Sequence, residues 1–329
     1  MPDMLPISIR STGKALPARR IYSAELDRLL CKPAGFVQKR SGIEYRYHAD
    51  LIESQSALAA RALHDALSHA QLPPGSIDLL LSASGVQEQA LPSTACQILN
   101  AAGVPAGVPG FDINASCFSF PVAFQVAASL LNTSLYRRIA IVSSDLASRG
   151  LDWDTPEASL IFGDGAAAAI VERGDGTTGI EGYLLRTYPE GRTYCEIRGG
   201  GSRKNPRTGI DSSDTVFHMD GKRVFKLASK VMPDMLADLL DTTHITLDNI
   251  DTVIPHQASH LGMRHLARQL RIPEARIVDI YATHGNQVAA SIPTALHEAF
   301  ATGRAEAGSR LLMIGTAAGL TVGGLILKV

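Results

Sequence analysis

Short uninterrupted apolar segments alternate with longer amphipathic ones along most of the chain. Apolar runs of strand length occupy 77–82 and 138–143, and each ends in a serine. Alanine and leucine recur at helical spacing over 54–70, until a Pro-Pro-Gly sequence ends that segment. Unbroken apolar runs are typical of strands that are covered on both faces. The alternation therefore predicts an α/β fold with a largely parallel sheet covered by helices.

The same patterns predict the remaining elements. They are a strand at 5–13, a helix at 24–30 with Ser23 as its cap, helices at 92–103, 121–131, 221–240 and 289–300, and a turn followed by a strand at 159–172. The nearly uncharged run 311–327 is short for a membrane span and contains four glycines. We therefore expect two buried strands joined by a glycine turn there. From 174 to about 214 the composition indicates a linker or an elaborated surface loop.

The second half of the chain repeats the order of the first. The apolar run 250–254 follows a helix and a turn, as 77–81 does. The segment 276–281 and its following helix likewise resemble the segment 110–113 and the helix after it. A period this long predicts a duplicated domain rather than a solenoid. The two halves are predicted at 1–173 and 174–329.

Three predicted strand ends carry polar or nucleophilic side chains. Cys117, His256 and Asn286 each follow one of these strands. If the two halves are equivalent, the three ends meet, because functional groups in α/β folds gather at the carboxyl ends of strands. Taken singly, each residue has an ordinary structural explanation: a small buried thiol, a polar strand end, or a Gly-Asn turn. His284, close to Asn286, is a second candidate for the histidine.

The composition excludes several classes of protein. The chain has 31 basic and 32 acidic residues without a polybasic block or an acidic tail, so nucleic acid is not an expected partner. The four cysteines form no CxxC pair, which argues against a disulfide framework and against a metal site. The segment 1–20 lacks the apolar core of a signal peptide. We therefore expect reduced thiols, no membrane association and a cytoplasmic location.

A cysteine at a helix N-terminus is suited to nucleophilic chemistry. Unpaired amides and the positive end of the helix dipole favour a thiolate, so we expect a lowered pKa for Cys117. A thiolate can attack a thioester carbonyl and hold the acyl group covalently. Histidine and asparagine offer N–H donors to an enolate oxygen, and losing one such donor typically costs about a hundredfold or more in rate. The three residues together predict acyl-transfer chemistry.

Five motifs then point to a known family. NASCFSF around Cys117, IFGDGAAA at 161–168, DGKRVFKLA at 220–228, PHQAS at 255–259 and HGNQVAASIP at 284–293 closely resemble the β-ketoacyl-acyl-carrier-protein synthase III family. Their order and spacing fit along nearly the whole chain. The resemblance implies the thiolase fold, which is a duplicated five-layer αβαβα unit, and a homodimer.

The resemblance also implies a reaction in two half-reactions. Cys117 takes an acyl group from acyl-CoA, and its own backbone N–H and that of Ala318 form the oxyanion hole. Malonyl on acyl carrier protein, or malonyl-CoA, then loses CO2, while His256 and Asn286 stabilise the enolate that attacks the acyl-enzyme. No cofactor is held permanently, since the coenzyme A thioester is a substrate. The Gly163-Asp164-Gly165 sequence is expected to form a structural turn beneath the site.

Substrate contacts follow from the same resemblance. By composition alone, the segment that contains Phe36 and Arg40 is a solvated loop. In the family these positions correspond to the platform for the CoA adenine and a phosphate contact, and Ser259 corresponds to a contact with the CoA or carrier arm. The residues expected in the acyl pocket are Leu91, Ser119 and Leu320.

Departures from the housekeeping pattern of the family concern the substrate more than the reaction. Leu91 stands where a phenylalanine often closes the acyl pocket of the partner subunit, and Ala318 replaces a glycine. Leu261 replaces an arginine that helps to dock the carrier protein, although Arg264 and Arg268 could substitute for it. We therefore expect a divergent member that uses a non-acetyl primer in a specialised pathway.

Two other functions are compatible with parts of this pattern. An acyltransferase would pass the Cys117 acyl group to a hydroxyl or amine without decarboxylation, but relatives of that kind often alter the histidine or the asparagine. A non-catalytic subunit like the chain-length factors of polyketide systems characteristically lacks the cysteine. The intact set favours a condensing enzyme, either of fatty acid biosynthesis or of polyketide or other secondary metabolite biosynthesis.

Overall fold

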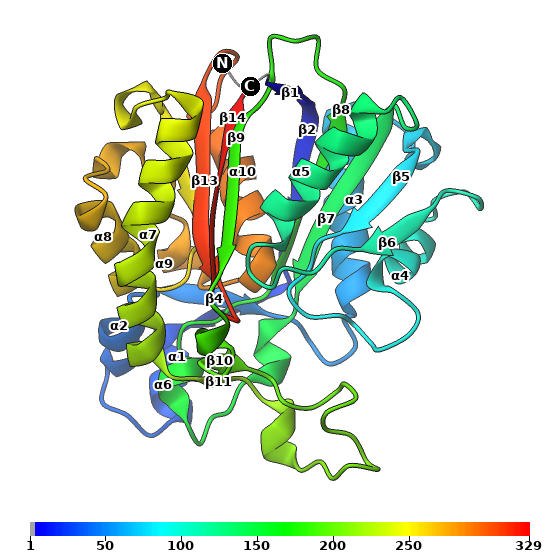
Figure 1. Cartoon of the computed structure of the whole chain (residues 1–329). Helices are drawn as coiled ribbons and strands as arrows, with labels where there is room; N and C mark the ends of the chain where they lie inside the picture. Colours follow the sequence, from blue (N-terminus) through cyan, green and yellow to red (C-terminus); the bar gives the residue numbers. More distant parts are fainter. Residues whose placement is uncertain (1–3) are drawn as a thin grey trace.

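Two five-stranded sheets form the centre of the molecule (Figure 1). The computed structural model describes residues 4–329, so the expectations that concern residues 1–3 lie outside the described residues. The first sheet has the order β2 (Ser8–Ala15), β8 (Gly165–Glu172), β7 (Arg138–Asp145), β5 (Leu79–Ser82) and β6 (Gly110–Asp112). The second has the order β1 (Leu5–Pro6), β9 (Gly179–Thr187), β14 (Thr321–Lys328), β13 (Arg310–Ala317) and β12 (Thr252–Pro255).

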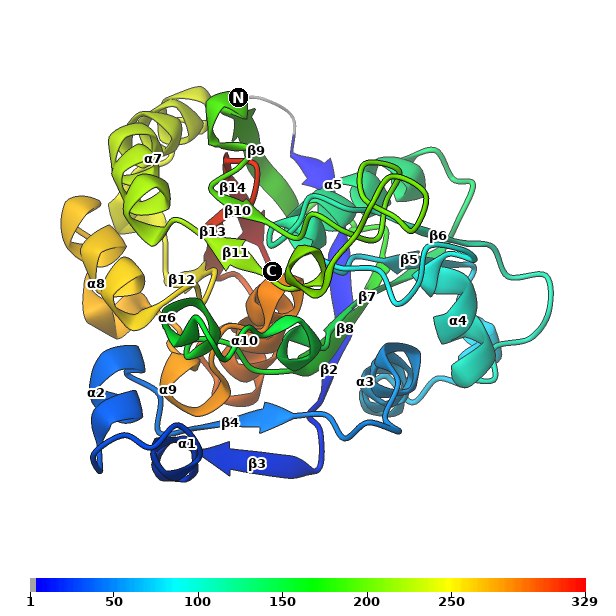
Figure 2. The same ribbon diagram turned by 90° about the horizontal axis from the view of Figure 1, so that it is seen from below.

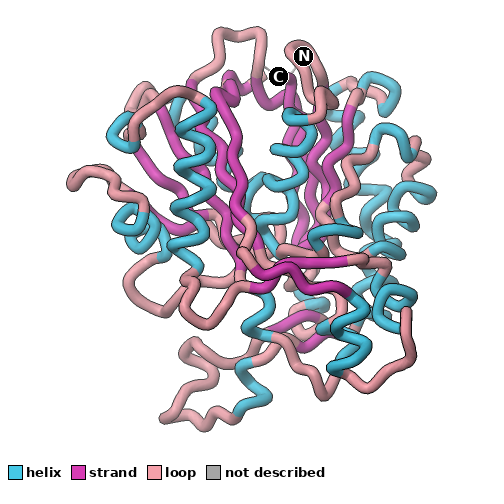
Figure 3. The backbone as a smooth tube through the Cα atoms, turned by 180° about the vertical axis from the view of Figure 1, so that it is seen from behind, coloured by secondary structure: helices cyan, strands magenta, loops and turns pink. Residues whose placement is uncertain are grey.

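Helices lie between the two sheets and on their outer faces. The helices α5 (Ser119–Asn132) and α10 (Ser291–Ala301) fill the central layer and share one apolar core with both sheets. The outer face of the first sheet is covered by α3 (Gln55–His69) and α4 (Thr94–Ala101), and that of the second by α7 (Gly221–Thr243) and α8 (His260–Gln269). Seen from behind in Figure 3, strand layers again alternate with helices. The order of layers is αβαβα, as the family resemblance implied.

Alternate residues of the central strands pack on opposite sides of each sheet. In β7, Ile139 and Ile141 belong to the central core, whereas Ala140 and Val142 pack with α3. This is the period of two that a pleated strand imposes. Because both faces of the sheet are covered, the strand is apolar at each of these four positions, which explains the apolar run in the sequence.

The two sheets share one topology. The strands β5 and β7 run parallel, as do β12 and β13, and in each sheet the next strand, β8 or β14, returns antiparallel. Asp78, just before β5, accepts hydrogen bonds from the backbone amides of Arg137 and Arg138, and Asp251 accepts the equivalent bond from Arg310. These matched contacts support a duplicated unit. The division into halves at residue 173 remains a proposal.

Both sheets are mixed rather than largely parallel, which corrects the sequence prediction. β14 follows β13 after only the three residues 318–320, and so short a connection can join only antiparallel strands. The predicted strand 5–13 is also divided. Ile7 separates β1, which pairs with β9 of the second sheet, from β2, which pairs with β8 of the first.

The segment 174–214, which was predicted as a linker or surface loop, contains the central strand β9. This strand pairs with β14 along its length. Its charged residues give the segment the composition of a surface loop. In the fold, the charge of Glu181 is neutralised by an ion pair with Arg310 of β13 at 2.7 Å. Such a partner, 129 residues away, cannot be recognised from local composition. The remainder of the segment includes β10 (Cys195–Glu196) and surface turns, as expected of an elaborated loop.

Two smaller predictions are wrong. Ser23 does not cap a helix, because α1 (Ser23–Leu29) begins at this residue and its hydroxyl donates to the Ile43 carbonyl at 2.5 Å. The segment 276–281 is not a strand: a single bridge joins Ile277 to Val253, and the chain then enters α9 (Tyr281–His284).

Shorter elements gather at one end of the sheets, the end seen from below in Figure 2. The ribbon of β3 (Arg19–Tyr22) and β4 (Tyr45–His48) lies there beside α1 and α2 (Phe36–Ser41). The helix α6 (Pro156–Ser159) and the pair of β10 with β11 (His218–Met219) lie at the same end. Within residues 4–329, no helix is long and apolar enough to cross a membrane.

Candidate active site

Cys117 lies in the turn between β6 and α5. Ser116, the residue before it, has a left-handed backbone conformation with φ of 53°, which is uncommon outside glycine and clusters at functional sites. The Asn114 side chain accepts a hydrogen bond from the Ser116 amide at 2.8 Å, and the Ser119 hydroxyl accepts one from the Ala115 amide at 2.9 Å. These bonds fix the turn that carries the thiol.

The pKa of Cys117 differs from the sequence prediction. Burial raises the pKa of this thiol to about 11, and the carboxylate of Asp145 acts in the same direction. Hydrogen bonds from the Ser116 hydroxyl and from two backbone amides lower it by less. The predicted lowering is therefore wrong, because loss of water around a thiolate outweighs the donors at the helix start. At neutral pH the Cys117 side chain is therefore a thiol rather than a thiolate.

The two amides at the sulfur are those predicted for the oxyanion hole. The backbone N–H groups of Ala318 and Cys117 both hydrogen-bond to the Cys117 sulfur. Ala318 begins the turn between β13 and β14, and Leu320 in that turn exchanges backbone hydrogen bonds with Tyr188. Amides this close to the sulfur are also close to the oxygen of a thioester that the sulfur attacks.

His256 directly follows β12 and is buried. Its amide donates to the Ile314 carbonyl at 2.8 Å. Gly315 leaves room for the ring, since a Cβ at that position would lie 2.6 Å from the Cβ of His256. Burial lowers the pKa of His256 to about 4, so the imidazole is neutral at pH 7. A neutral imidazole donates a hydrogen bond without adding a positive charge to the site.

Asn286 is held close to His256. Its Nδ2 donates to the Ala258 carbonyl at 3.3 Å, and the Ala258 amide donates to the His256 carbonyl at 2.8 Å. Its Oδ1 accepts from the Val288 amide at 2.8 Å. Because a backbone donor occupies Oδ1, the side-chain amide has one orientation, with Nδ2 toward the Ala258 carbonyl. The structure thus ties Asn286 to the segment that directly follows His256.

The turn at 161–165 supports Asn286. The Asn286 amide donates to the Ile161 carbonyl at 2.8 Å, and the Gly163 amide donates to the Asn286 carbonyl at 3.1 Å. Gly163 cannot carry a side chain, since a Cβ there would lie 2.1 Å from the carbonyl oxygen of His284. Asp164, which is fully buried, anchors the turn by accepting two backbone hydrogen bonds. The turn has the structural role that was expected of it.

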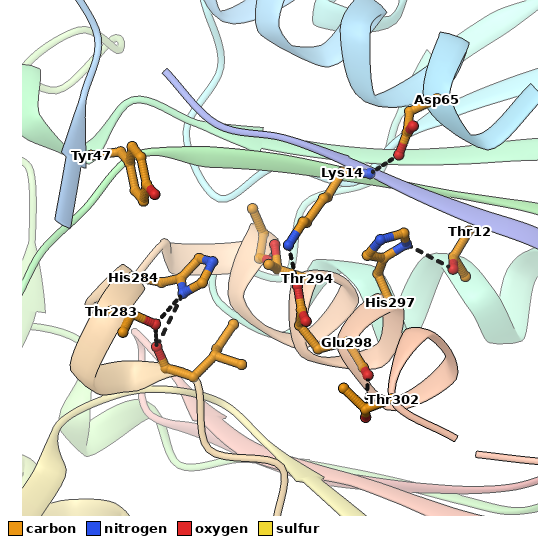
Figure 4. A network of polar contacts seen from close by, with 12 residues as sticks. Thr12, Lys14, Tyr47, Asp65, Thr283, His284, Thr294, His297, Glu298 and Thr302 are labelled. Carbon is orange, nitrogen blue, oxygen red and sulfur yellow. Dashed lines mark hydrogen bonds and ion pairs between the residues drawn. The ribbon is translucent and has the colours of Figure 1, made fainter. Parts of the chain in front are cut away.

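His284 belongs to a separate polar network, which Figure 4 shows. Its Nδ1 contacts the Thr283 hydroxyl at 2.8 Å and a backbone carbonyl at 3.2 Å. The ion pair of Lys14 with Glu298 lies nearby in the same network. His284 Nδ1 is thus engaged in this network, whereas the Asn286 side chain is bonded to the segment that follows His256. In the part of the chain that the structure describes, no group of His, Cys, Asp or Glu side chains is arranged to hold a metal ion.

Phe36 and Arg40 lie on the helix α2 rather than in a loop. Lys32 Nζ and Arg40 Cζ lie 5.6 and 5.8 Å from the centre of the Phe36 ring. A ring beside two cations can stack on an aromatic base and hold phosphate groups. Ser259 caps α8, because its hydroxyl accepts a hydrogen bond from the Gly262 amide at 3.1 Å. This capping role is additional to the predicted contact with the CoA arm.

The three residues predicted for the acyl pocket differ in their surroundings. Leu91 is 85% exposed on the loop before α4. Leu320 is buried and packs against Gly191. Ser119 is fully buried, and its hydroxyl donates to two backbone carbonyls. Ser119 therefore braces the Cys117 turn rather than offering a polar group to a substrate, whereas the pocket roles of Leu91 and Leu320 remain predictions.

Two buried residues that the sequence analysis did not single out organise the site. Gln257 donates to the Pro255 and Val278 carbonyls at 2.9 and 3.1 Å, which ties the end of β12 to the neighbouring segment. Asp145, at the end of β7, accepts hydrogen bonds from amides on two different loops. Each residue comes at the end of a buried apolar run, and this position could have marked it in the sequence as a candidate for the site. The partner amides are too distant in sequence to be inferred.

Comparisons with known proteins assign the family. Residues 111–189 match the family model of 3-oxoacyl-[acyl-carrier-protein] synthase III, and residues 240–329 match that of its C-terminal part. A β-ketoacyl-[acyl-carrier-protein] synthase III of Allorhizobium ampelinum is 32% identical over 99% of this chain and 100% of its own length. One from Clostridium perfringens is 30% identical over 96% of this chain and 97% of its own.

Solved structures agree with this assignment. A 3-oxoacyl-[acyl-carrier-protein] synthase III of Aquifex aeolicus has a TM-score of 0.88 and 28% identity, and covers 98% of this chain and 100% of that one. An OleA variant of Xanthomonas campestris, with a TM-score of 0.86 and 21% identity over 98% of both chains, shows the fold alone. The protein is therefore a condensing enzyme with the thiolase fold, in the acyltransferase class. It belongs to the 3-oxoacyl-[acyl-carrier-protein] synthase III family.

Proposed function

We propose that the protein joins an acyl group from acyl-CoA to a malonyl thioester by decarboxylative Claisen condensation. This proposal is supported by two observations: the backbone amide of Ala318, after β13, reaches the sulfur of Cys117, after β6, and the Asn286 amide is bonded to the segment that follows a neutral His256. The names of the relatives support the same reaction, since they are β-ketoacyl-[acyl-carrier-protein] synthases.

In the first half-reaction, the sulfur of Cys117 attacks the thioester carbonyl of acyl-CoA. The oxyanion accepts hydrogen bonds from the backbone amides of Cys117 and Ala318, which already lie at the sulfur. The bond to the CoA sulfur then breaks, and CoA leaves as a thiol with the proton that Cys117 has lost. The raised pKa of Cys117 makes proton loss part of the attack rather than a step before it.

In the second half-reaction, the malonyl group loses its carboxylate as CO2. The electron pair of the broken bond moves to the thioester carbonyl and forms an enolate, whose oxygen accepts hydrogen bonds from His256 and Asn286. The enolate carbon attacks the acyl group on Cys117, and the sulfur leaves and takes up a proton from water. Because burial keeps His256 neutral, it acts as a hydrogen-bond donor to the enolate and not as a counter-cation.

The substrates are proposed from the residues that surround this site. Phe36 and Arg40 would hold the nucleotide end of coenzyme A, which is a substrate and not a permanent cofactor. Leu91 and Leu320 would shape an acyl pocket that differs from that of an acetyl-primed enzyme, so the primer is proposed to be a non-acetyl group. A specialised pathway, rather than the initiation of general fatty acid synthesis, is consistent with this difference.

The carrier protein is proposed to dock on α8. This helix exposes Leu261, Arg264 and Arg268 at helical spacing, and it contains no acidic residue. Cations on this face would attract the acidic surface expected of a carrier protein. The leucine in place of an arginine makes this docking weaker than in the housekeeping enzymes of the family.

The protein is proposed to act as a homodimer through β6. This strand is the edge of the first sheet, and Phe111 on it is 42% exposed. Leu91, on the neighbouring loop, is 85% exposed. An edge strand with exposed apolar side chains is a natural site for pairing with a second copy. Pairing there would bury Leu91 against the acyl site of the partner.

The alternative function is acyl transfer from Cys117 to a hydroxyl or amine without decarboxylation. It needs Cys117 and its oxyanion amides but gives no role to an enolate-stabilising pair. The oriented Asn286 beside a neutral His256 favours condensation, because acyl transfer to a preformed nucleophile does not generate an enolate.

The proposal is tested with a panel of acyl-CoAs followed by malonyl-CoA or malonyl-carrier protein. We expect acyl mass on Cys117, then CO2 release, with no acylation in Cys117→Ala and full acylation in Cys96→Ala, an exposed cysteine. Asn286→Ala should still be acylated but release CO2 about a hundredfold more slowly. Acylation without CO2 release from any malonyl thioester would exclude condensation. Equal loss of both steps in Cys117→Ala and Asn286→Ala would contradict the assigned roles.

A further inference from the structure

Asp145 is a buried carboxylate that the reaction described above does not use. It is the last residue of β7 and is 1% exposed. Its oxygens accept hydrogen bonds from the Gly85 amide at 3.0 Å, the Val86 amide at 3.0 Å and the Ala289 amide at 3.1 Å. Among the described residues no cation forms an ion pair with it. Burial raises the pKa of Asp145 to about 8 in spite of these amides, so its charge is present only above that pH, where backbone amides alone balance it.

These amides belong to two loops on opposite sides of the site. Gly85 and Val86 begin the loop that leads to Leu91, and the Gly85 carbonyl accepts a hydrogen bond from Asn114, in the Cys117 turn, at 3.2 Å. Ala289 follows Asn286 in the chain, in the short turn that directly precedes α10. One carboxylate thus joins the loop on the nucleophile side to the turn on the decarboxylation side.

The two loops also pack directly on each other. Val288, whose amide orients Asn286, has a left-handed backbone conformation with φ of 53°, which is strained for a β-branched residue. Its Cγ1 lies against Gly85, where an added Cβ would approach it to 2.4 Å. Such a conformation persists only where the surroundings enforce it, and the amide of the next residue, Ala289, is bonded to Asp145.

We propose that Asp145 is a positioning residue, which holds the Gly85 loop and the Asn286 turn in register and presents the negative charge that Cys117 faces. The roles of Cys117 and Asn286 rest on the proposed function, whereas the packing of the two loops does not. Asp145 and Cys195 are the titratable side chains that interact with the Cys117 thiol. His256 is uncharged above a pH of about 4, and burial raises the pKa of Cys195 to about 12. Near pH 9, which is above the pKa of about 8 to which burial raises Asp145, Asp145 is thus the charged group of this set.

The test is Asp145→Asn, which keeps the shape but replaces one acceptor oxygen with an NH2 group that faces backbone donors. Removal of the charge should let Cys117 ionise more readily, so its alkylation by iodoacetamide at pH 9 should rise about threefold or more. Displacement of the Asn286 turn should slow CO2 release by the acylated enzyme about tenfold or more. The two effects together support the proposal. At pH 7, where Asp145 is largely uncharged, the rise should be smaller, whereas loss of a merely structural residue would raise alkylation equally at both pH values.

The matched control is Asp27→Asn. It alters another buried carboxylate, which accepts hydrogen bonds from the backbone amides of Gly35 and Val37. It should leave the alkylation of Cys117 unchanged. An unchanged alkylation rate in Asp145→Asn would overturn the proposal, and so would unchanged CO2 release. The alkylation assay needs no substrate, so its outcome is independent of whether the condensation proposal holds.

If Asp145→Asn does not fold, hydrogen exchange of the wild-type enzyme decides the question. Peptides that contain Gly85 with Val86, and Ala289 with Ala290, should have amide protection factors within about tenfold of each other, because one anchor holds both loops. Protection of only one of the two loops would overturn the proposal.

Discussion

At the scale of single residues, the site holds its reactive groups in uncharged forms. Burial raises the pKa of the Cys117 thiol to about 11 and lowers that of the His256 imidazole to about 4. Both shifts have the same cause, since a buried site that has lost water disfavours either charged form. A neutral thiol is protected from adventitious alkylation and oxidation, and in the proposed reaction it becomes a nucleophile only when a thioester carbonyl lies between it and the proposed oxyanion amides.

The first prediction concerns the ionisation of Cys117. Because its pKa is raised, the thiolate fraction increases about tenfold per pH unit well above neutrality. The rate of iodoacetamide alkylation of Cys117 in the substrate-free enzyme should therefore climb continuously from pH 7 to pH 10. Peptide mass spectrometry measures this rate separately from that of the exposed Cys31 and Cys96. A plateau already reached below pH 8 would mean that the pKa is lowered, as the helix start alone suggested.

At the scale of elements, the site depends on two turns that pack too closely to leave room for a side chain at their contact. The turn at 161–165 approaches the His284-Gly285-Asn286 turn so closely that two glycines are required. Gly163 faces the His284 carbonyl, and Gly285 has a left-handed φ of 69° with the Ile161 carbonyl 2.9 Å from where its Cβ would lie. Two segments that are more than a hundred residues apart thus support Asn286 together.

The second prediction follows from this contact. In Gly163→Ala, the new methyl group would collide with the His284 carbonyl, so the two turns must separate. We expect a loss of about 1–3 kcal/mol in the free energy of unfolding and slower CO2 release, with acylation of Cys117 less affected. Urea denaturation and the two half-reaction assays measure these effects. Gly201→Ala is the control, since nothing lies within 4 Å of a Cβ at that position. Equal stability of the two variants would refute the packing argument.

The third prediction concerns α8 and the carrier protein. Leu261→Arg adds a cation to the face that already exposes Arg264 and Arg268, so the KM for malonyl-carrier protein should fall several-fold at low salt. Arg264→Ala should raise this KM, and neither change should alter the KM for malonyl-CoA, which lacks the protein surface. Steady-state kinetics with the two malonyl donors provide the comparison. Parallel changes for both donors would place this face in the active site instead of at a docking surface.

The sequence was sufficient for most elements of the fold but not for those whose identity depends on distant partners. Apolar runs such as 77–82 indicated buried strands because both faces of the sheet are covered. β9 was missed because Glu181 has its cation on β13, and 276–281 was predicted as a strand although it makes only one bridge. Strand pairing is a non-local property, and alternation within one segment does not determine it.

The candidate site shows the same limit. The motifs pointed to Cys117, His256 and Asn286, whose roles remain a proposal. The direction of the Cys117 pKa shift was wrong, because the sequence indicates a helix start but not the depth of burial. Asp145 was missed because its partner amides lie 59, 60 and 144 residues away. Residue types could be predicted, whereas burial and long-range hydrogen bonds required the fold.

At the scale of the whole molecule, the proposed nucleophile and the proposed enolate-stabilising pair belong to different sheets. Cys117 follows a strand of the first sheet, and His256 follows a strand of the second. The central helices α5 and α10, packed in one core, fix the distance between them. The first sheet ends in the exposed strand β6, which connects the site with a proposed second copy.

The fourth prediction concerns this assembly. If two copies pair through β6, Phe111→Lys introduces like charges beside the pairing strand and should shift the protein from dimer to monomer. Analytical ultracentrifugation measures the change, and the monomer should lose most of its condensing activity because Leu91 no longer reaches a partner. Leu29→Lys, another exposed apolar position on α1, which lies far from β6 in Figures 1 and 2, is the control. A wild-type protein that is monomeric at micromolar concentration would contradict the proposed dimer.

The central claim is that one cysteine first carries an acyl group and then passes it to a carbon nucleophile made by decarboxylation. Its most direct test is a single turnover of enzyme that has been acylated on Cys117, freed of CoA and mixed with malonyl thioester labelled in its free carboxylate. We predict labelled CO2 in an amount equal to the acyl groups lost from Cys117, together with a 3-ketoacyl thioester. Loss of the acyl group from Cys117 to an acceptor without any labelled CO2 would contradict the account.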